Sequence, residues 1–288
     1  MRLQRVVIAL TVILYGYVVS LSPAHAEEKG AGTYGSGMNK FTLATGSPGE
    51  LRLLKVLGET FGKDTDASLC WMKAGSGESM QMLKEKKVDM IMVHAPDAEK
   101  KAIADGWAVN RKLIGSNEFF IVGPPQDPAG IAKAATAAEA YAAIAKVKAK
   151  FFSRGDNSGT HKKEMDVWKK NGITPSGDWY IVTKDFMTAT LKRADTEKGY
   201  FMTDSSTWVA EKKNVHNLTI LFRGDKFLVN TYHTLAQPAG ATPGAATAAK
   251  FIDFVASEKG QQIIREFGKA EHGEGLYNDE VYAKKYDD

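Results

Sequence analysis

Apolar residues along the chain recur in two patterns that alternate with each other. Short continuous apolar runs predict buried strands, as at residues 88–93 (VDMIMV) and 119–123 (FFIVG). The segments between such runs carry apolar residues at helical spacing, for example across residues 51–61. Alternation of strand and helix is the signature of helices packed on a largely parallel sheet. We therefore predict a fold of the α/β class.

The remaining elements follow the same two patterns. Further strands are predicted at residues 40–44, 67–74, 179–182, 200–203 and 227–235. Further helices are predicted at residues 79–86, 132–148, 159–170, 185–194 and 207–212, and within 245–267. Ser47, Pro48 and Glu50 match a capping box, with Ser47 as the N-cap of a helix that continues through residue 61.

The strand–helix alternation falls into two sets, and the sequence contains no internal repeat. Extended segments near residues 116–124 and 226–236 separate the sets. We predict two lobes, with these segments crossing between them and the final helices returning to the first lobe. The predicted lobe 1 comprises residues 40–117 and 231–288, and the predicted lobe 2 comprises residues 118–230.

The first 26 residues have the pattern of a secretory signal peptide. Arg2 and Arg5 precede an apolar run over residues 6–21, and Ala24-His25-Ala26 fits the small-x-small rule for cleavage. The run is at or below the roughly 17 to 25 residues that a membrane-spanning helix needs. Cleavage near Ala26 predicts a periplasmic protein. Residues 27–39 are rich in glycine and short of apolar side chains, so we expect them to form a flexible lead-in.

Charge and cysteine content argue against several classes of function. The chain has 288 residues and a formal net charge of +4, which falls to +2 when Arg2 and Arg5 leave with the signal peptide. Nucleic-acid binding usually needs a concentrated basic face, so no nucleic-acid partner is expected. The one cysteine, Cys70, cannot form an intramolecular disulfide, and no cysteine–histidine cluster predicts a metal site or a cofactor.

Three strand-to-helix turns share one composition, with hydroxyl side chains beside glycine. They are residues 45–47 (Thr-Gly-Ser), 75–77 (Gly-Ser-Gly) and 154–160 (Arg-Gly-Asp-Asn-Ser-Gly-Thr). The first turn of a helix has amide donors without internal partners and about half a positive charge, so it attracts anions. Ligands of open α/β sheets gather at the carboxyl ends of strands. Two turns belong to the predicted lobe 1 and one to lobe 2, which predicts an anion site between the lobes.

The third turn supplies the strongest donors. Arg154 carries a permanent charge in a forked geometry that suits oxyanions. Ser158 and Thr160 supply hydroxyls, and Gly159 exposes an amide because it has no Cβ. Three roles remain open for Asp156: it caps the helix, holds Arg154, or accepts a proton from a protonated ligand such as hydrogen phosphate.

These motifs resemble those of the periplasmic tungstate-binding proteins of bacterial ABC importers. The resemblance covers nearly the whole mature chain and rests on LATGS, AGSG, VDMIMVHAPDAE, EFFIVGPPQDPAGI, FFSRGDNSGTHKKEMDVWK, MTATL, YFMTDSSTW and LVNTYHTLA. It implies the two-lobed type II periplasmic-binding-protein fold, a tetrahedral oxyanion as ligand and an ABC transporter permease as partner. The oxyanion contacts that it implies are Thr45, Gly46, Ser47, Ser76, Arg154, Ser158, Gly159 and Thr160.

The chain departs from that family at two of the turns. The family usually has a threonine-threonine-serine first turn where this chain has Thr45-Gly46-Ser47, and a threonine in the second turn where this chain has Ser76. One hydroxyl is thereby lost and another shortened. We expect tungstate as the ligand, with phosphate, molybdate and sulfate as the alternatives for the same fold.

Other readings of the same residues lead to different functions. A periplasmic hydrolase or transferase would use Ser158 or Thr160 as nucleophile with His161 nearby, but no second group that would orient a base is evident, so we expect no catalysis. A regulatory subunit that presents the bound state to a membrane sensor is a third reading. We expect a monomer. His94 is interpreted as a structural histidine, and the turn at Asp204 as a fourth cap that could face the cleft.

Overall fold

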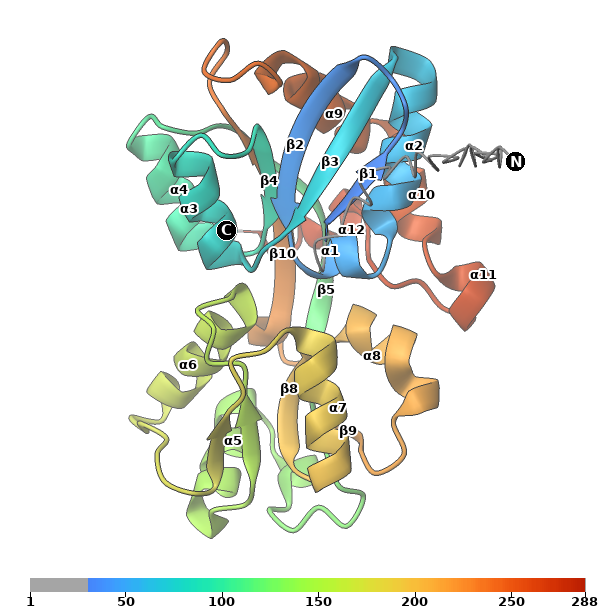
Figure 1. Ribbon diagram of the computed structural model, residues 1–288. Coiled ribbons are helices and arrows are strands. Elements are labelled where there is room, and N and C mark those ends of the chain that lie inside the picture. Colours follow the sequence, from blue (N-terminus) through green and yellow to red (C-terminus); the bar gives the residue numbers. More distant parts are fainter. Residues whose placement is uncertain (1–30, 288) are drawn as a thin grey trace, which may run out of the picture.

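The computed structural model describes residues 31–287, which form two α/β lobes joined by two long strands (Figure 1). The strands are β1 (Ala31–Tyr34), β2 (Asn39–Thr45), β3 (Ala67–Lys73), β4 (Met90–Val93), β5 (Val109–Gly123), β6 (Phe151–Ser153), β7 (Tyr180–Val182), β8 (Tyr200–Asp204), β9 (Thr219–Phe222) and β10 (Val229–Ala236). The predicted signal peptide, residues 1–26, lies outside the described residues.

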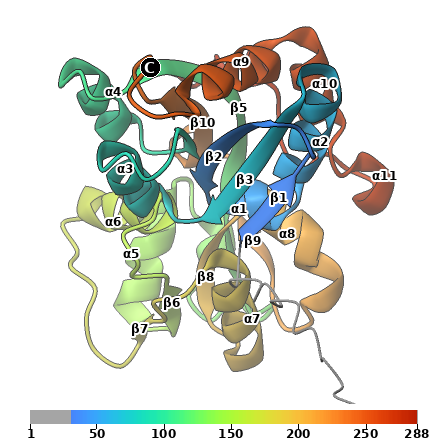
Figure 2. The ribbon, with the colours of Figure 1, turned by 45° about the horizontal axis from the view of Figure 1, so that its top comes forward.

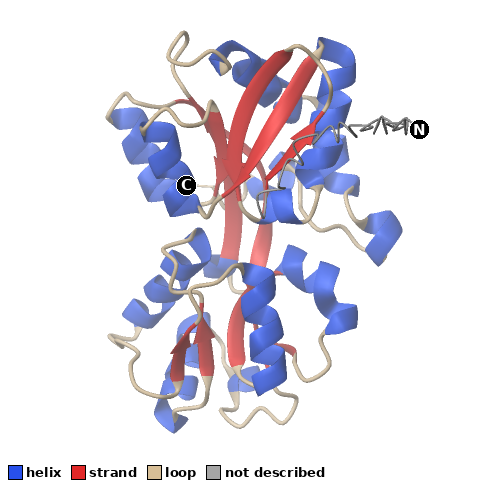
Figure 3. Ribbon diagram, in the orientation of Figure 1, coloured by secondary structure: helices blue, strands red, loops and turns tan. Residues whose placement is uncertain are grey.

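Helices cover both lobes, as the colouring by secondary structure shows (Figure 3). The α-helices are α1 (Ser47–Glu50), α2 (Leu53–Thr65), α3 (Ser76–Lys84), α4 (Pro96–Ala104), α5 (Ala137–Val147), α6 (Gly159–Lys170), α7 (Met187–Glu197), α8 (Ser205–Glu211), α9 (Ala245–Ala256), α10 (Glu258–Glu266), α11 (Lys269–His272) and α12 (Glu280–Ala283). Short 3₁₀ turns are η1 (Ile131–Lys133), η2 (Lys212–Asn214) and η3 (Lys226–Leu228).

Lobe 1 contains β1 to β4, α1 to α4 and α9 to α12. Its strands lie in the order β1-β3-β2-β4, with β2 parallel to both β3 and β4 and β1 antiparallel at the edge. The prediction of a flexible lead-in over residues 27–39 is therefore wrong for residues 31–34, which form β1, and for Asn39, which begins β2. Backbone pairing with β3 gives this glycine-rich segment an order that its few apolar side chains do not predict.

Helices pack on both faces of the lobe 1 sheet (Figure 2). Alternation along β4 shows why: Met90 and Met92 join the apolar cluster beneath α2, α9 and α10, whereas Ile91 and Val93 join the cluster beneath α3 and α4. Successive side chains of a strand point to opposite faces, so a strand covered on both sides must be apolar throughout. The continuous run that predicts this strand is a direct result of that burial.

Lobe 2 contains β6 to β9 and α5 to α8. Its central strands lie in the order β8-β6-β7 and are parallel. A fully buried aromatic cluster of Tyr141, Phe151 and Trp168 holds α5 and α6 against β6, with ring centroids 4.2 to 5.2 Å apart. The parallel arrangement places the end of β6, and the turn that follows it, at the edge that faces lobe 1 (Figure 1).

The two lobes are joined by β5 and β10, which pair antiparallel and run through both (Figure 1). Asn117 and Asn230 lie opposite each other in this pair, and the Asn230 Nδ2 donates to the Asn117 Oδ1 at 2.8 Å. Asn117 in turn donates to Asp204 Oδ1 at 3.1 Å and to Ser206 Oγ at 2.9 Å. The lobe limits predicted at residues 117/118 and 230/231 fall inside these two crossing strands. The turn at Asp204 is thus a cap that supports the crossing.

Some predicted elements have different limits in the structure. The helix predicted over residues 132–148 is α5 preceded by η1, because Thr136 caps α5 by accepting from the Glu139 amide at 3.1 Å. The run within residues 245–267 is two helices, because Ser257 caps α10 by accepting from the Gly260 amide. The strand predicted at 119–123 is the end of β5. The pattern missed β1, β9, α4, α11 and α12.

Candidate anion-binding site

The three glycine–hydroxyl turns meet at one small cavity between the lobes. Of the eight residues predicted to contact an anion, six line this cavity, and the other residues that line it come from neighbouring strands and turns. The six are Thr45, Gly46, Ser47, Ser76, Arg154 and Ser158; the others are Pro48, Gly75, Met92, His94 and Tyr232. Gly159 lines an adjoining cleft, and Thr160 lines neither space. The strand-end argument therefore brings the turns together, but two of the eight residues lie outside the cavity.

The first turn follows β2. Thr45 is buried, and its Oγ1 donates to the Met92 carbonyl at 2.7 Å, so its hydroxyl hydrogen is already engaged. The predicted capping box is absent, because α1 begins at Ser47 itself and its N-cap is Gly46. Glu50 instead pairs with Lys73 Nζ at 2.7 Å. Within residues 31–287 no hydrogen bond engages the Ser47 hydroxyl, so it is available to a ligand.

The second turn follows β3 and opens α3. Gly75 is the N-cap and contributes no side chain, so the first amides of α3 have no side-chain acceptor. Ser76 is 4% exposed, and its Oγ accepts from the His94 amide at 3.3 Å. That bond orients the Ser76 hydroxyl so that its hydrogen remains free to donate.

The third turn is held together by Asp156. Its Oδ2 accepts from Arg154 Nε at 3.1 Å and from Arg154 Nη2 at 2.5 Å, and its Oδ1 accepts from the Ser158 amide at 3.1 Å. Arg154 is 5% exposed and also donates to the Asp185 carbonyl at 3.3 Å. Of the three roles left open for Asp156, the structure shows one: it holds the guanidinium. Asp156 does not cap α6, whose N-cap is Ser158, but it orders the turn before that helix through the Ser158 amide.

Unpaired backbone amides from all three turns accompany these side chains. Ser158 caps α6 through its Oγ, which accepts from the His161 amide at 3.3 Å. In the described part of the chain no acceptor takes the amides of Ser47, Ser76, Gly159 or Thr160. Three helix N-termini thus converge with their positive ends toward one space, which is the arrangement that binds a compact anion.

The lobes are in contact around the cavity, and glycines permit that contact. A Cβ on Gly75 would lie 3.2 Å from the Ser158 Cβ, and one on Gly77 would lie 2.7 Å from the Asn157 carbonyl oxygen. The cavity has a volume of only about 10 Å³, which is roughly the space of one water molecule, so a bulky ligand is excluded from it.

His94 lines the cavity as well, which the interpretation as a structural histidine missed. Its ring packs 4.9 Å from the Tyr232 ring and 6.2 Å from the Phe119 ring, and its Nδ1 is buried without a hydrogen-bond partner. Burial, and then the charge of Arg154, lower the pKa of His94 to about 3, so the imidazole is neutral at physiological pH. Its position directly after β4, at the same sheet edge as Thr45, is the signal that could have identified it.

Comparison with known proteins agrees with this geometry. The sequence matches the PBP superfamily domain over residues 23–259. It is 34% identical over 276 residues to the tungstate-binding protein TupA of Peptoclostridium acidaminophilum, an alignment that covers 94% of each chain. The chain belongs to the PBP superfamily, in the family of the tungstate-binding proteins.

Solved structures of this family have the same fold. The tungstate ABC transporter protein from Geobacter sulfurreducens is 38% identical, with a TM-score of 0.72 over 81% of this chain and 100% of that one. The tungstate-binding protein TupA from Desulfovibrio alaskensis G20 is 35% identical, with a TM-score of 0.68 over 83% of this chain and 98% of that one. The predicted two-lobed periplasmic-binding-protein fold is confirmed.

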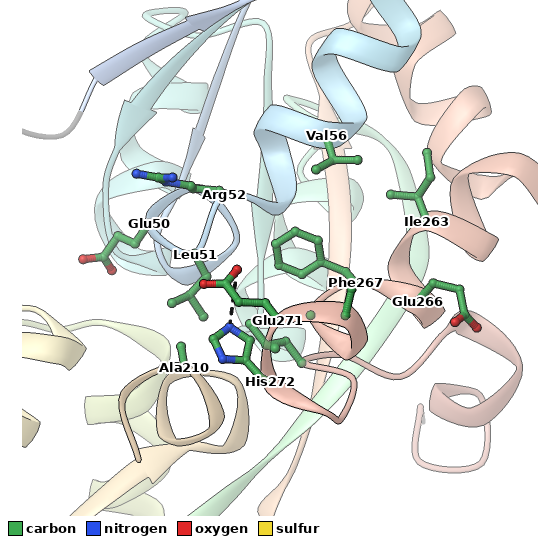
Figure 4. Close-up of a pocket in the computed structure, with 13 residues that line it drawn as sticks. Glu50, Leu51, Arg52, Val56, Ala210, Ile263, Glu266, Phe267, Glu271 and His272 are labelled. Atoms are coloured by element: carbon green, nitrogen blue, oxygen red, sulfur yellow. Dashed lines mark ion pairs between the residues drawn. The ribbon is translucent and has the colours of Figure 1, made fainter. Parts of the chain in front are cut away.

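A larger space on this PBP-superfamily protein has the wrong chemistry for an anion. It is an open groove of about 660 Å³ between α1, α2, α10 and α11, with Ala210 of lobe 2 at its margin (Figure 4). Val56 and Phe267 line it together with three carboxylates, whereas Arg52 and His272 are its basic side chains (Figure 4). The three carboxylates are those of Glu50, Glu266 and Glu271. None of the eight predicted residues lines it.

Within residues 31–287, every helix is too short or too polar to span a membrane. The same residues contain no group of three or more histidine, cysteine or acidic side chains placed to hold a metal ion.

Proposed function

We propose that this protein captures tungstate between its two lobes in the periplasm and delivers it to the permease of an ABC importer. The observation that carries the proposal is the convergence of three helix N-termini and the Arg154 guanidinium on one cavity that no acidic side chain lines. The family relatives support the identity of the anion, because two solved structures and a close sequence relative are named for tungstate.

Each predicted residue has a role in this site. Ser47 and Ser76 donate their hydroxyl hydrogens, and Arg154 supplies the charge. Ser158 lines the cavity, and because its Oγ accepts in the cap of α6, its hydroxyl hydrogen also remains free to donate. Gly159 and Thr160 lie at the start of α6, outside the cavity lining, and act through their backbone amides. Gly46 acts through its backbone amide as well. Thr45 fixes the sheet edge through Met92.

The number of donors is sufficient for tight binding. Hydrogen bonds to a charged group contribute on the order of 1.5 to 3 kcal/mol each. About six of them would reach the roughly 12 kcal/mol of nanomolar affinity before ordering costs are subtracted. A tetrahedral dianion has four acceptor oxygens and can use that many donors.

The site favours a fully deprotonated anion over hydrogen phosphate. Hydrogen phosphate carries a proton and needs an acceptor, and Asp156 is the acceptor that the sequence offers. Both Asp156 oxygens already accept from Arg154 and from the Ser158 amide, and Asp156 does not line the cavity. Tungstate, molybdate and sulfate carry no proton, so all of their oxygens accept hydrogen bonds. This matches a site whose groups are donors.

A hydrolase or transferase lacks support from the geometry. The Ser158 Oγ accepts from the His161 amide, whereas the His161 Nδ1 accepts from the Asn157 amide at 3.0 Å, so this imidazole is not paired with the hydroxyl. Thr160 does not reach the cavity. A nucleophile needs a base within hydrogen-bond reach, and neither hydroxyl has one. We infer that the protein binds its ligand without changing it.

A thermal-shift panel tests the proposal. Mature protein is heated with tungstate, molybdate, sulfate, phosphate or vanadate at equal concentration. A ligand that binds only the folded state raises the melting temperature by mass action, so tungstate should give the largest shift. A largest shift with phosphate would refute the choice of anion, and no shift with any of the five would refute the function.

A further inference from the structure

Phe186, immediately before α7, lies against two cations that come from different lobes. Lys73 Nζ is 3.9 Å from the centroid of its ring, and Arg154 Cζ is 5.4 Å from the same centroid. Lys73 is the last residue of β3 in lobe 1, whereas Phe186 and Arg154 belong to lobe 2. One aromatic ring therefore connects the arginine of the anion site to the opposite lobe.

On the lobe 2 side, the Phe186 segment supports the guanidinium. The Asp185 carbonyl accepts from Arg154 Nε at 3.3 Å, and the Asp185 side chain accepts from the Phe186 amide at 2.8 Å. The neighbouring backbone thus holds one edge of the guanidinium while the ring lies against it. Asp156 holds it from within its own turn. The orientation of Arg154 depends on both supports.

On the lobe 1 side, Lys73 is tied to the first turn of the anion site. Its Nζ pairs with Glu50 Oε1 at 2.7 Å, with side chains only 24% and 16% exposed. Glu50 is the last residue of α1, the helix that begins at Ser47. The contact of Lys73 with Phe186 exists only while the lobes are closed, because it spans them.

We propose that Phe186 is a positioning residue for the oxyanion site and that it couples closure of the lobes to the alignment of Arg154. The proposal rests on the oxyanion-binding function proposed above. The negative face of an aromatic ring attracts cations, and the attraction is stronger where water is excluded. Closure brings Lys73 onto the ring that already supports Arg154, so that contacts from both lobes hold the ring beside the guanidinium.

Variants at the two positions separate this role from simple packing. Phe186→Leu keeps an apolar side chain but removes the ring, whereas Phe186→Tyr keeps the ring. Lys73→Met keeps the stem of the lysine and removes its charge. Lys84→Met is the matched control, because Lys84 Nζ lies 6.0 Å from the Trp107 ring centroid and both residues belong to lobe 1.

Tungstate affinity and dissociation rate are measured for each variant by calorimetry and stopped-flow tryptophan fluorescence. Phe186→Leu should raise Kd by about 10- to 30-fold, and Phe186→Tyr by less than about 3-fold. Lys73→Met should raise Kd by about 3- to 10-fold, mainly through faster dissociation. Lys84→Met should leave Kd unchanged. The double variant of Phe186→Leu and Lys73→Met should lose less than the product of the two single losses, because the two residues act in one contact.

The outcomes distinguish this inference from the function on which it rests. If wild type binds tungstate and Phe186→Leu binds as Phe186→Tyr does, the inference is wrong and the function stands. If the rise in Kd of the double variant equals the product of the two single rises, the two residues act independently and the proposed coupling is refuted. If wild type binds none of the anions, both fail. Circular dichroism checks that Phe186→Leu folds. If this variant does not fold, the Kd of Lys73→Met tests the inference instead.

Discussion

A methyl group added at Gly159 should weaken ligand binding without weakening the fold. Gly159 is the first residue of α6, and a Cβ there would lie 2.2 Å from Cε1 and 2.4 Å from Nδ1 of the His94 ring in the opposite lobe. The ring has little room to move, because Tyr232 and Phe119 pack around it. The clash therefore exists only when the lobes close.

The size of the effect follows from this contact. Overpacking a filled site costs about 1 to 3 kcal/mol, which corresponds to a loss of about 5- to 150-fold in tungstate affinity. Alanine is intrinsically the better helix residue, so the free energy of unfolding without ligand should not fall.

Calorimetry with tungstate, together with thermal unfolding of the unligated protein, checks the prediction. The double variant of Gly159→Ala and His94→Ala should recover part of the affinity that Gly159→Ala loses, because the space taken by the ring is vacated. A Gly159→Ala variant that binds as tightly as wild type would show that the lobes do not approach at this point. Failure of the double variant to recover any affinity would refute the steric reasoning.

Four further predictions concern charge, pH and export. Arg154→Ala should lower tungstate affinity by at least about 30-fold in calorimetry, whereas Arg154→Lys should lose less, since it keeps the charge but not the fork. The pKa of His94 is lowered to about 3 in the folded protein, against about 6.5 in the unfolded chain, so stability should fall as pH drops from about 6.5 toward 3. Chemical denaturation should show a shallower fall for His94→Gln. Burial raises the pKa of Glu164 to about 7. Between about pH 4.3 and 7 the folded protein therefore binds a proton at Glu164 that the unfolded chain does not, and stability should fall as pH rises through that window. Glu164→Gln should remove this slope in the same assay. N-terminal sequencing of the exported protein should begin at Glu27.

Much of the fold could be predicted because its signals are local. The helix at residues 159–170 has the predicted limits, since Ser158 caps it and its apolar residues recur on one face. The strand run at residues 88–93 is apolar because both faces of β4 are covered. Turn composition was enough to identify six of the eleven residues that line the cavity, since strand ends of parallel sheets meet at one edge.

What could not be predicted depends on contacts between distant residues. Ser47 has every local feature of an N-cap, yet Lys73 takes the carboxylate that would complete the capping box. His94 reaches the cavity only because β4 lies beside β2. The local sequence around Phe186 gives no sign of its proposed role, since that role depends on its contact with Lys73 of the other lobe.

Anomalous scattering from tungsten, in crystals grown with tungstate, tests the central claim most directly. We expect one strong peak enclosed by the turns at Ser47, Ser76 and Arg154, within hydrogen-bond reach of their donors. A protein that binds tungstate in solution but shows its tungsten outside this cavity would contradict the account.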